Sequence, residues 1–516
     1  MTASTATGPL VLSVDVGTSA VKAGVYTTDG ARVAGSSAAL TATSPRRGHW
    51  TMDAGQVESA LVAAVREVAA AVPARRVAAM GVSTAAPTPL VVDGEGRPLS
   101  EVCTFSDARA AGTVRQLVAD GAGPGFLRRT GNRLAVATTS ALTATALWDA
   151  ADRPAGARFG HLASLVTHRL TGRWVMDPTH AAFTGLTDMH TSGTWSETAI
   201  ADLGVPPELL PELLSSSEAA GPLTPAAAER LGLPAGIPVT VGAADTACAA
   251  LGVGCVEHGR TFESVGTSGV LTICRDHPVP MEGAMNRPHA VPGRWLSHWA
   301  MSSSGGSLRW LAETGVGSTA GHDPADLAAL TELAAAAPPG SDGVLFLPYL
   351  CGERSPVWDA DARGAWAGLG LGTGPAHLVR SVLESTGYAL RQFMELERKE
   401  SGLEVTEVAS VGGGSASATW SQIKADVTGR TFRRVPDGNA ACRGASLLAC
   451  SAAGLVDDLA SAAERRSPEL STPVRPTPDA AARETYDRMF EAYLSLYPAL
   501  RDVDAMLTTA AEGGPT

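Results

Sequence analysis

Two short segments with the same Gly-Thr-Ser core could hold a phosphate group. The first, residues 14–19 (VDVGTS), lies near the start of the chain, and the second, residues 263–268 (ESVGTS), lies just past its middle. Each follows apolar or β-branched residues and precedes more of them, which is typical of two strands joined by a tight glycine turn. Such a turn offers backbone N–H groups and two hydroxyls to phosphate oxygens. A repeat this short also arises by chance in a long chain, so its meaning depends on the surrounding residues.

Asp15 ends the first of these apolar runs, and its carboxylate could serve a metal ion. The carboxyl end of a buried strand is where open α/β sheets place their ligands. Burying a carboxylate there is unfavourable unless water or a cation accompanies it, and Mg²⁺ beside phosphate groups is a natural cation. The alternative is an aspartate that only shapes the turn before Gly17. Lys22, further along the chain, either faces a phosphate or lies in solvent.

Asp245 ends a second apolar run, residues 239–244, in which small residues leave room for another molecule. A carboxylate in that position could accept a proton from a substrate hydroxyl. The alternative is a helix N-cap for the apolar residues 246–251. Position alone favours the cap, so a catalytic role needs further support.

A third glycine-rich turn, residues 412–414, follows the apolar residues 408–411 and precedes a helical pattern. Such a turn lets a nucleotide base or phosphate approach the backbone, although a glycine triplet alone is usually only a turn. The chain contains neither GxGxxG nor GxxxxGKS or GxxxxGKT, so no dinucleotide fold or P-loop is indicated. It also lacks a GxSxG motif, which leaves serine-hydrolase chemistry unsupported.

The composition restricts the class of protein. A chain of 516 residues is too long for one core, so we expect two domains of about 200–250 residues each. The net charge of −12 argues against nucleic-acid binding, which normally needs a basic patch. The seven cysteines are scattered without a CxxC pair, as in a cytoplasmic protein with reduced thiols. The most apolar long segment, residues 239–256, is interrupted by Asp245 and by glycines, so we expect no membrane span.

Hydrophobic periodicity predicts an α/β fold in both halves of the chain. In the first half, a buried strand precedes a hairpin with its turn at Asp29-Gly30, followed by a helix and another buried strand. A proline-rich connecting layer over residues 203–238 comes next, and the second half then restarts the pattern. The expected strands include residues 10–16, 21–27, 31–36, 77–82, 344–347 and 408–411, and the expected helices include 56–72, 376–400, 420–427, 443–453 and 480–496.

Taken in order, these motifs resemble the FGGY family of carbohydrate kinases, within the actin, hexokinase and heat-shock ATPase superfamily. The resemblance extends over about residues 10–496, and residues 345–368 are its most specific part. The matching segments are DVGTSAVK at 15–22, FSDAR at 105–109, TGN at 130–132, LTG at 170–172, GAAD at 242–245, VGTS at 265–268, FLPYLCGERSP at 346–356, DARG at 361–364 and VGGG at 411–414.

The resemblance implies two actin-like (ribonuclease H-like) α/β domains around an interdomain cleft. Residues 9–250 would form the N-terminal, sugar-binding domain, and residues 251–500 the C-terminal, nucleotide-binding domain. ATP and Mg²⁺ are the implied cofactors, and a small sugar or polyol is the implied partner. A homodimer is left open, whereas neither a nucleic acid nor a membrane is implied, and the expected location is cytoplasmic.

Carried over position by position, the resemblance assigns Asp245 as the general base and Asp15 as the carboxylate that helps to hold Mg²⁺ through water. It therefore favours the catalytic interpretation of Asp245 over the helix cap. The implied nucleotide-binding residues are Gly17, Thr18, Ser19, Lys22, Gly266, Thr267, Gly305, Arg309, Gly412 and Gly413. The implied acceptor-binding residues are Thr84, Ala86, Pro87, Phe105, Asp107 and Asp245.

The acceptor-binding loop departs from the family pattern. Xylulose kinases carry Gly-Gln-Met-His-Gly where this chain has Thr-Ala-Ala-Pro-Thr at 84–88, and glycerol kinases carry an Arg-Glu pair there. A small, proline-stiffened loop supplies few polar contacts, and Phe105 replaces a usual tryptophan and its N–H donor. The remaining motifs are more similar to those of xylulose and gluconate kinases.

We therefore expect ATP-dependent phosphorylation of a sugar hydroxyl, in the first place on a ketopentose such as xylulose. Gluconate, another ketose or a polyol are alternative acceptors. A non-catalytic sugar or nucleotide sensor on the same fold is a further alternative. The presence of both Asp15 and Asp245 argues against the sensor, because a protein of this fold without kinase activity would be expected to lose one of them.

Overall fold

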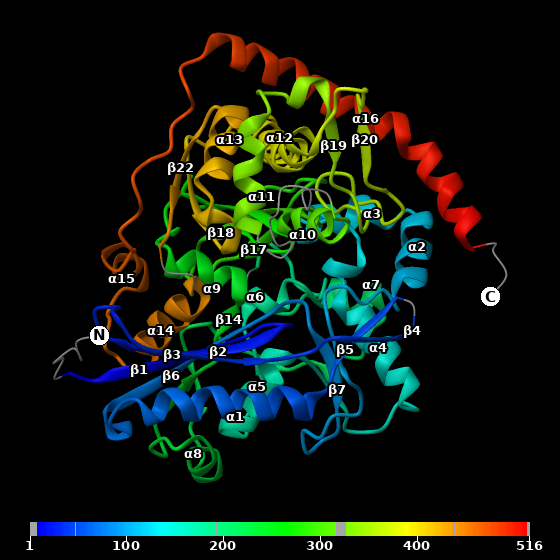
Figure 1. The fold of residues 1–516 in the computed structure, drawn as a ribbon. Coiled ribbons are helices and arrows are strands. Elements are labelled where there is room, and N and C mark those ends of the chain that lie inside the picture. Colours follow the sequence, from blue (N-terminus) through cyan, green and yellow to red (C-terminus); the bar gives the residue numbers. More distant parts are fainter. Residues whose placement is uncertain (1–7, 47, 192, 316–326, 437–438, 513–516) are drawn as a thin grey trace. The chain divides into compact units, whose positions relative to one another are not determined.

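The computed structural model of the chain describes residues 8–46, 48–191, 193–315, 327–436 and 439–512 (Figure 1). Its internal contacts divide these residues into two compact units. The first unit comprises residues up to 258, together with 274–297 and 439–467. The second comprises residues 259–273, 298–436 and those from 468 onward. Both units are mixed α/β structures.

The sheet of the first unit is built around β1 (Leu10–Val16), whose continuous apolar run is buried on both faces. β1 forms an antiparallel hairpin with β2 (Ala20–Thr27), and β2 pairs in the same way with β3 (Arg32–Ala39), which confirms both predicted strands and their turn. On its other side β1 pairs in parallel with β6 (Val77–Thr84). The complete order is β12-β13-β6-β1-β2-β3, so the edge strands are β12 (Ala219–Pro222) and β3. β13 (Pro238–Thr240) lies between β12 and β6, and β14 (Ala243–Ala244) also pairs with β6.

Helices cover both faces of this sheet (Figure 1). α1 (Ala54–Ala70) begins at Asp53, whose carboxylate accepts a hydrogen bond from the Gln56 N–H at 2.7 Å. Its buried stripe packs with the even-numbered residues of β1, as the helical periodicity predicted. α14 (Ala440–Ala452) packs with Val11 on the opposite face. The alternation of side chains along β1 thus places one helix on each face.

The first unit also contains further short strands and surrounding helices. They are β4 (Thr43–Arg46), β5 (His49–Met52), β7 (Pro89–Val92), β8 (Val102–Cys103), β9 (Arg158–His161), β10 (Val175–Met176), β11 (Glu212–Leu213), β17 (Met285–Pro288), α2 (Ala111–Ala119), α3 (Gly123–Thr130), α4 (Ser140–Ala150), α5 (Leu162–Thr171), α6 (Pro178–Ala181), α7 (Glu197–Leu203), α8 (Pro225–Leu231) and α15 (Leu459–Arg465).

The second unit repeats the hairpin arrangement of the first. β15 (Thr261–Val265) and β16 (Gly269–Arg275) form an antiparallel hairpin around the second Gly-Thr-Ser turn, and β21 (Glu407–Val411) pairs in parallel with β15. The strand order is β18-β16-β15-β21-β22. The other elements are β18 (Trp295–Met301), β22 (Thr431–Arg434), β19 (Leu345–Leu347), β20 (Ala365–Ala367), α10 (Gly305–Glu313), α11 (Leu327–Leu333), α12 (Pro375–Ser401), α13 (Ala418–Thr428) and α16 (Ala480–Glu512).

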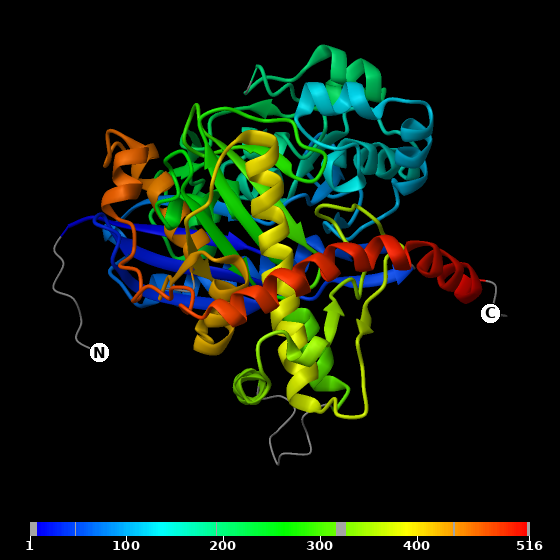
Figure 2. The same ribbon diagram turned by 90° about the horizontal axis from the view of Figure 1, so that it is seen from above.

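The last helix is longer than the sequence predicted. α16 continues through Pro498 to Glu512, whereas the predicted helix ended at residue 496. The residues around and beyond the proline are held by side-chain contacts within the second unit. Tyr497 donates to Asp359 at 2.8 Å, and Asp504 accepts from the Arg363 N–H at 3.1 Å. α16 also contacts α12 where the two helices cross (Figure 2). No helix among the residues placed in the structure combines the length and apolar character needed to cross a bilayer.

A very close helix contact supports α9 (Asp245–Gly252), the helix that begins with Asp245. A Cβ on Gly444 of α14 would lie 1.8 Å from the Cys248 carbonyl oxygen, and one on Gly252 would lie 2.0 Å from the Ala440 carbonyl oxygen. The backbones of α9 and α14 therefore touch, which only glycine permits.

We expect Gly444→Ala to destabilise the first unit, because the added methyl group would meet backbone and not a movable side chain. Overpacking of this kind lowers the free energy of unfolding by about 1–3 kcal/mol. Gly112→Ala is the control, since that position in α2 has no heavy atom within 4 Å and alanine is the better helix former. Urea unfolding compares the variants, and an unchanged midpoint for Gly444→Ala would contradict the close contact.

Candidate active site

Three parallel strands of the first unit end at one edge of the sheet. In the β1–β6 register Asp15 lies opposite Ser83 and Val16 opposite Thr84. In the β14–β6 register Ala243 lies opposite Ser83 and Ala244 opposite Thr84. Asp245, the next residue, therefore leaves the sheet at the same edge as Asp15, with β6 between the two strands, where parallel sheets place their ligands.

Asp15 is a partly buried carboxylate with a mixed environment. Its Oδ1 accepts a hydrogen bond from the Ser83 hydroxyl at 2.9 Å, and Lys22 faces it across the hairpin. Burial raises the pKa of Asp15, while the Ser83 hydrogen bond and the Lys22 charge act in the opposite direction. Within the described ranges, no group of three or more His, Cys, Asp or Glu side chains could enclose a metal ion. The Asp15 carboxylate alone can serve a cation whose other ligands are water and phosphate oxygens.

Asp245 is the first residue of α9 and is not its N-cap, which is Ala244. The capping alternative from the sequence is therefore wrong. The Asp245 Oδ1 accepts hydrogen bonds from the Thr246 N–H at 2.6 Å and the Thr246 hydroxyl at 3.1 Å. Burial, reinforced by the negative charge of Asp15, raises the pKa of Asp245 to about 6. The hydrogen bonds from Thr246 and the charge of His180 lower this pKa, but by less. A carboxylate with a pKa near neutrality suits general-base chemistry.

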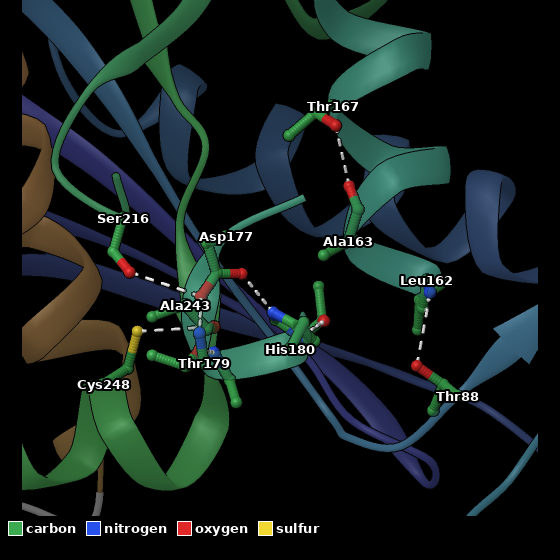
Figure 3. Close-up of polar contacts among 12 residues, drawn as sticks. Thr88, Leu162, Ala163, Thr167, Asp177, Thr179, His180, Ser216, Ala243 and Cys248 are labelled. Atoms are coloured by element: carbon green, nitrogen blue, oxygen red, sulfur yellow. Dashed lines mark hydrogen bonds and ion pairs between the residues drawn. The ribbon is translucent and has the colours of Figure 1, made fainter. Parts of the chain in front are cut away.

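A buried network centred on Asp177 positions the residue before Asp245 (Figure 3). Asp177 caps α6, accepting from the Thr179 N–H at 2.8 Å and from the Ser216 hydroxyl at 3.3 Å, and it also binds the Thr179 hydroxyl. The Thr179 hydroxyl oxygen in turn accepts from the Ala244 N–H at 2.8 Å. The strand end that carries Asp245 is therefore tied to a buried carboxylate.

The same network reaches β6 through His180, which the sequence analysis did not identify. His180 Nδ1 pairs with Asp177 Oδ2, and His180 Nε2 lies 2.8 Å from the Thr84 hydroxyl oxygen. All three side chains are fully buried. The only sequence signal for this helix start was Asp177 before a proline, which marks an N-cap and says nothing of Thr84.

The predicted acceptor-binding residues differ in exposure and in hydrogen-bond partners. Thr84 is at the shared strand edge, but its hydroxyl is directed to His180. Ala86 and Pro87 follow it and bring no side-chain donor or acceptor. Phe105 is 43% exposed. Asp107 is buried, and its two oxygens accept hydrogen bonds from Arg109 and from the Trp50 N–H.

The first Gly-Thr-Ser turn lies at this same strand edge. Gly17 closes the hairpin by donating to the Ala20 carbonyl oxygen at 3.0 Å, and the Ser19 carbonyl oxygen accepts from the Leu40 N–H at 2.9 Å. Thr18 is partly exposed and Ser19 is exposed, so both hydroxyls are accessible beside Asp15 and Lys22. This turn can offer N–H and hydroxyl donors to a phosphate.

The second unit contains a cavity of about 780 Å³ at the ends of β15 and β21. Predicted nucleotide-binding residues line it, namely Gly266, Thr267, Gly305, Arg309 and Gly413. The Gly305 N–H donates to the Gly266 carbonyl oxygen at 2.9 Å, which joins the start of α10 to the turn. Gly412 is needed behind the cavity, because its φ is +91° and a Cβ there would lie 2.5 Å from the Val265 carbonyl oxygen. The size and glycine lining of this cavity fit a nucleotide.

A buried ion pair supports the strand that leads to this cavity. Lys424 of α13 pairs with Glu263 of β15, and the Ser410 hydroxyl donates to the same Glu263 oxygen at 2.6 Å. The three side chains link α13, β15 and β21 within the core of the second unit. A buried charge with both a counter-ion and a hydrogen-bond donor is electrostatically compensated.

The chain matches both domain models of one family. The N-terminal domain of the FGGY family of carbohydrate kinases matches residues 10–252, and the C-terminal domain matches residues 262–453. The gluconokinase of Bacillus subtilis (strain 168) is 26% identical over 500 residues, which cover 94% of this chain and 95% of that protein. The xylulose kinase of Escherichia coli (strain K12) is 33% identical over 346 residues, or 64% of this chain and 66% of that protein.

A solved structure shows the same fold. The crystal structure of xylulose kinase from Rhodospirillum rubrum aligns with a TM-score of 0.85 and 27% identity, covering 96% of this chain and 100% of that one. These similarities confirm the family resemblance, the two-domain α/β fold class and the carbohydrate-kinase activity that the motifs predicted. The chain therefore belongs to the FGGY family of carbohydrate kinases.

Proposed function

We propose that this kinase transfers the γ-phosphoryl group of ATP to a hydroxyl of a sugar, sugar acid or polyol, with Asp245 as general base. The observation that carries the proposal is the position of Asp245 at the shared strand edge, beside Asp15, with a pKa of about 6. The carboxylate can orient an acceptor hydroxyl and take its proton as the oxygen attacks phosphorus. Holding the reactants in that orientation accounts for roughly 7–11 kcal/mol of barrier in well-positioned systems.

The residues around Asp245 act on its position and its charge. Thr246 fixes the orientation of the carboxylate, and Thr179 holds the backbone of Ala244. Asp15 raises the proton affinity of Asp245 by charge repulsion. The carboxylate of Asp15, with water and phosphate oxygens, would hold Mg²⁺. When bound, Mg²⁺ neutralises charge on the phosphate oxygens.

The cavity of the second unit, with the Gly-Thr-Ser turn at its edge, is the proposed nucleotide site of that unit. The Gly-Thr-Ser turn of the first unit is proposed to offer phosphate donors of its own. Residues 9–250 would bind the acceptor and residues 251–500 the nucleotide. Arg309 of α10 supplies a cation at the cavity wall. The proposed nucleotide-binding residues are Gly17, Thr18, Ser19, Lys22, Gly266, Thr267, Gly305, Arg309, Gly412 and Gly413.

The range of acceptors follows from the relatives, which are named for gluconate and for xylulose. Thr84, Ala86, Pro87, Phe105 and Asp107 are proposed to border the acceptor. A sensor without activity is disfavoured because Asp15 and Asp245 are both present and brought together. The homodimer stays a prediction, which light scattering of the purified protein would test.

Asp245→Asn is expected to lower kcat by about 10²–10⁴-fold, since the amide occupies the same volume but cannot accept the proton. The Kd for ATP should not change, because the carboxylate acts on the acceptor. An ADP-release assay and calorimetry measure the two quantities. Asp502→Asn, at an exposed position of α16, is the matched control. Near-normal turnover of Asp245→Asn would remove this residue from the mechanism.

The value of kcat/KM for the acceptor is expected to fall on the acid side with an apparent pKa of about 6. The base works only when deprotonated, so activity is full above that pH and drops about tenfold per pH unit below it. Calorimetric binding of ATP over the same pH range, without acceptor, separates this effect from loss of nucleotide affinity. A profile that stays flat down to about pH 5 would contradict the assignment.

Gly413→Ala is expected to raise the KM for ATP about tenfold, equivalent to about 1.4 kcal/mol. A Cβ at Gly413 has no protein heavy atom within 4 Å, so any loss reports on the space that the nucleotide needs. Gly370→Ala, in a loop with equal free space, is the control. Unchanged thermal unfolding should accompany the higher KM. An unaltered KM for ATP would place the nucleotide elsewhere.

A further inference from the structure

Arg287 of β17 is a buried cation with an unusual set of contacts. Its side chain is 1% exposed and lies over the ring of Phe183 at 3.9 Å. Nη1 donates to the Asn132 side-chain oxygen at 2.7 Å and to the Asn286 carbonyl oxygen at 2.8 Å. Nε and Nη2 are buried without a hydrogen-bond partner among the residues that the structure describes. One edge of the guanidinium is therefore anchored and the other is unsatisfied.

Arg287 also has no counter-ion in the described part of the first unit. Two other buried cations of this chain are paired, Arg380 with Glu384 and Lys424 with Glu263. Burial alone lowers the pKa of Arg287 to about 9, with no opposing charge to raise it, so the group is still a cation at neutral pH. An uncompensated buried charge is strongly unfavourable, whereas an anion against it would remove most of that penalty.

The unsatisfied edge has the geometry that a carboxylate requires. Nε and Nη2 are the two parallel donors with which arginine binds both oxygens of a carboxylate. The same chain uses this edge elsewhere: Arg109 Nε and Nη2 donate to Asp107 Oδ1 and Oδ2 at 2.8 and 2.9 Å. In Arg287 the contacts of Nη1 fix the fork in advance, which reduces the entropy lost on binding.

The position of Arg287 connects it to the acceptor end of the site. β17 packs against α6, and Phe183, which covers the guanidinium, donates its N–H to the His180 carbonyl oxygen at 3.0 Å. His180 contacts the Thr84 hydroxyl, and its charge lowers the pKa of Asp245. This arrangement suits a ligand that carries its reacting hydroxyl at one end and an anionic group at the other.

We propose that Arg287 binds the carboxylate of the acceptor, so that the acceptor of this kinase is a sugar acid. The inference rests on the proposed function and selects one class from its range of acceptors. It replaces the sequence-based preference for xylulose. The carboxylate would accept from Nε and Nη2, while the hydroxyl at the far end of the carbon chain meets Asp245.

The test compares acids with neutral acceptors of equal length. D-gluconate and D-xylonate are assayed beside D-glucitol and D-xylulose, with Arg287→Met, Arg287→Lys and the unmutated enzyme. We expect the acids to be the better substrates, and Arg287→Met to raise their KM about 10–100-fold while leaving the KM for neutral acceptors unchanged. Arg287→Lys should recover part of the loss, because it keeps the charge without the fork. Arg133→Gln, at an exposed neighbouring position, is the control.

Thermal unfolding keeps the test independent of turnover. Gluconate should raise the midpoint of the unmutated protein and not that of Arg287→Met. Efficient turnover of neutral sugars, unaffected by Arg287→Met and with no stabilisation by gluconate, would overturn the carboxylate site and leave the kinase proposal intact. If no acceptor were phosphorylated, the proposed function would fail. Arg287-dependent stabilisation by gluconate would then still support the carboxylate site, and its absence would overturn it.

Discussion

Burial of Asp245 at a strand edge, reinforced by the charge of Asp15, is the constraint on which the proposed chemistry of this kinase depends. The parallel register of β1, β6 and β14 brings both carboxylates to one strand edge, where burial already disfavours their ionised forms. An exposed aspartate has a pKa near 4 and is a weak base at neutral pH. The neighbouring charge adds to burial and moves Asp245 into the range in which a base is effective. The pairing of these three strands thus contributes to the raised pKa of Asp245.

Holding two like charges together requires rigid supports, and the structure supplies them from several directions. Ser83 and Lys22 partly offset the burial of Asp15, and Thr246 does the same for Asp245. Asp177 fixes the backbone before Asp245 through Thr179. The glycine contact between α9 and α14 fixes the helix behind it. A carboxylate that could swing away would relieve the repulsion, and its proton affinity would return toward the ordinary value.

The sequence predicted elements whose signal is local and missed contacts that join distant segments. The β1–β2 hairpin, α1 and α12 follow from apolar periodicity and turn residues within a few positions of each other. Asp245 could not be chosen as a base over a helix cap from its neighbours alone, and the family motifs were needed. The Thr84–His180 pair spans 96 residues and the Asn132–Arg287 pair spans 155. No spacing rule connects such positions, so only the tertiary structure reveals them.

The buried cations Lys424 and Arg287 differ in how their charges are compensated within the described residues. Lys424 is buried and forms an ion pair with the Glu263 carboxylate, so its charge is balanced within the protein. Arg287 is equally buried, yet two of its three guanidinium nitrogens, Nε and Nη2, face no acceptor in the residues described. The loop at 84–88, which is proposed to border the acceptor, has few free polar groups, because the Thr84 hydroxyl is already bound by His180. The proposed carboxylate site would discriminate by charge and not by a pattern of hydroxyls. A neutral analogue would leave the guanidinium unpaired, and an unpaired buried polar group rejects an analogue far more strongly than a missing apolar contact does.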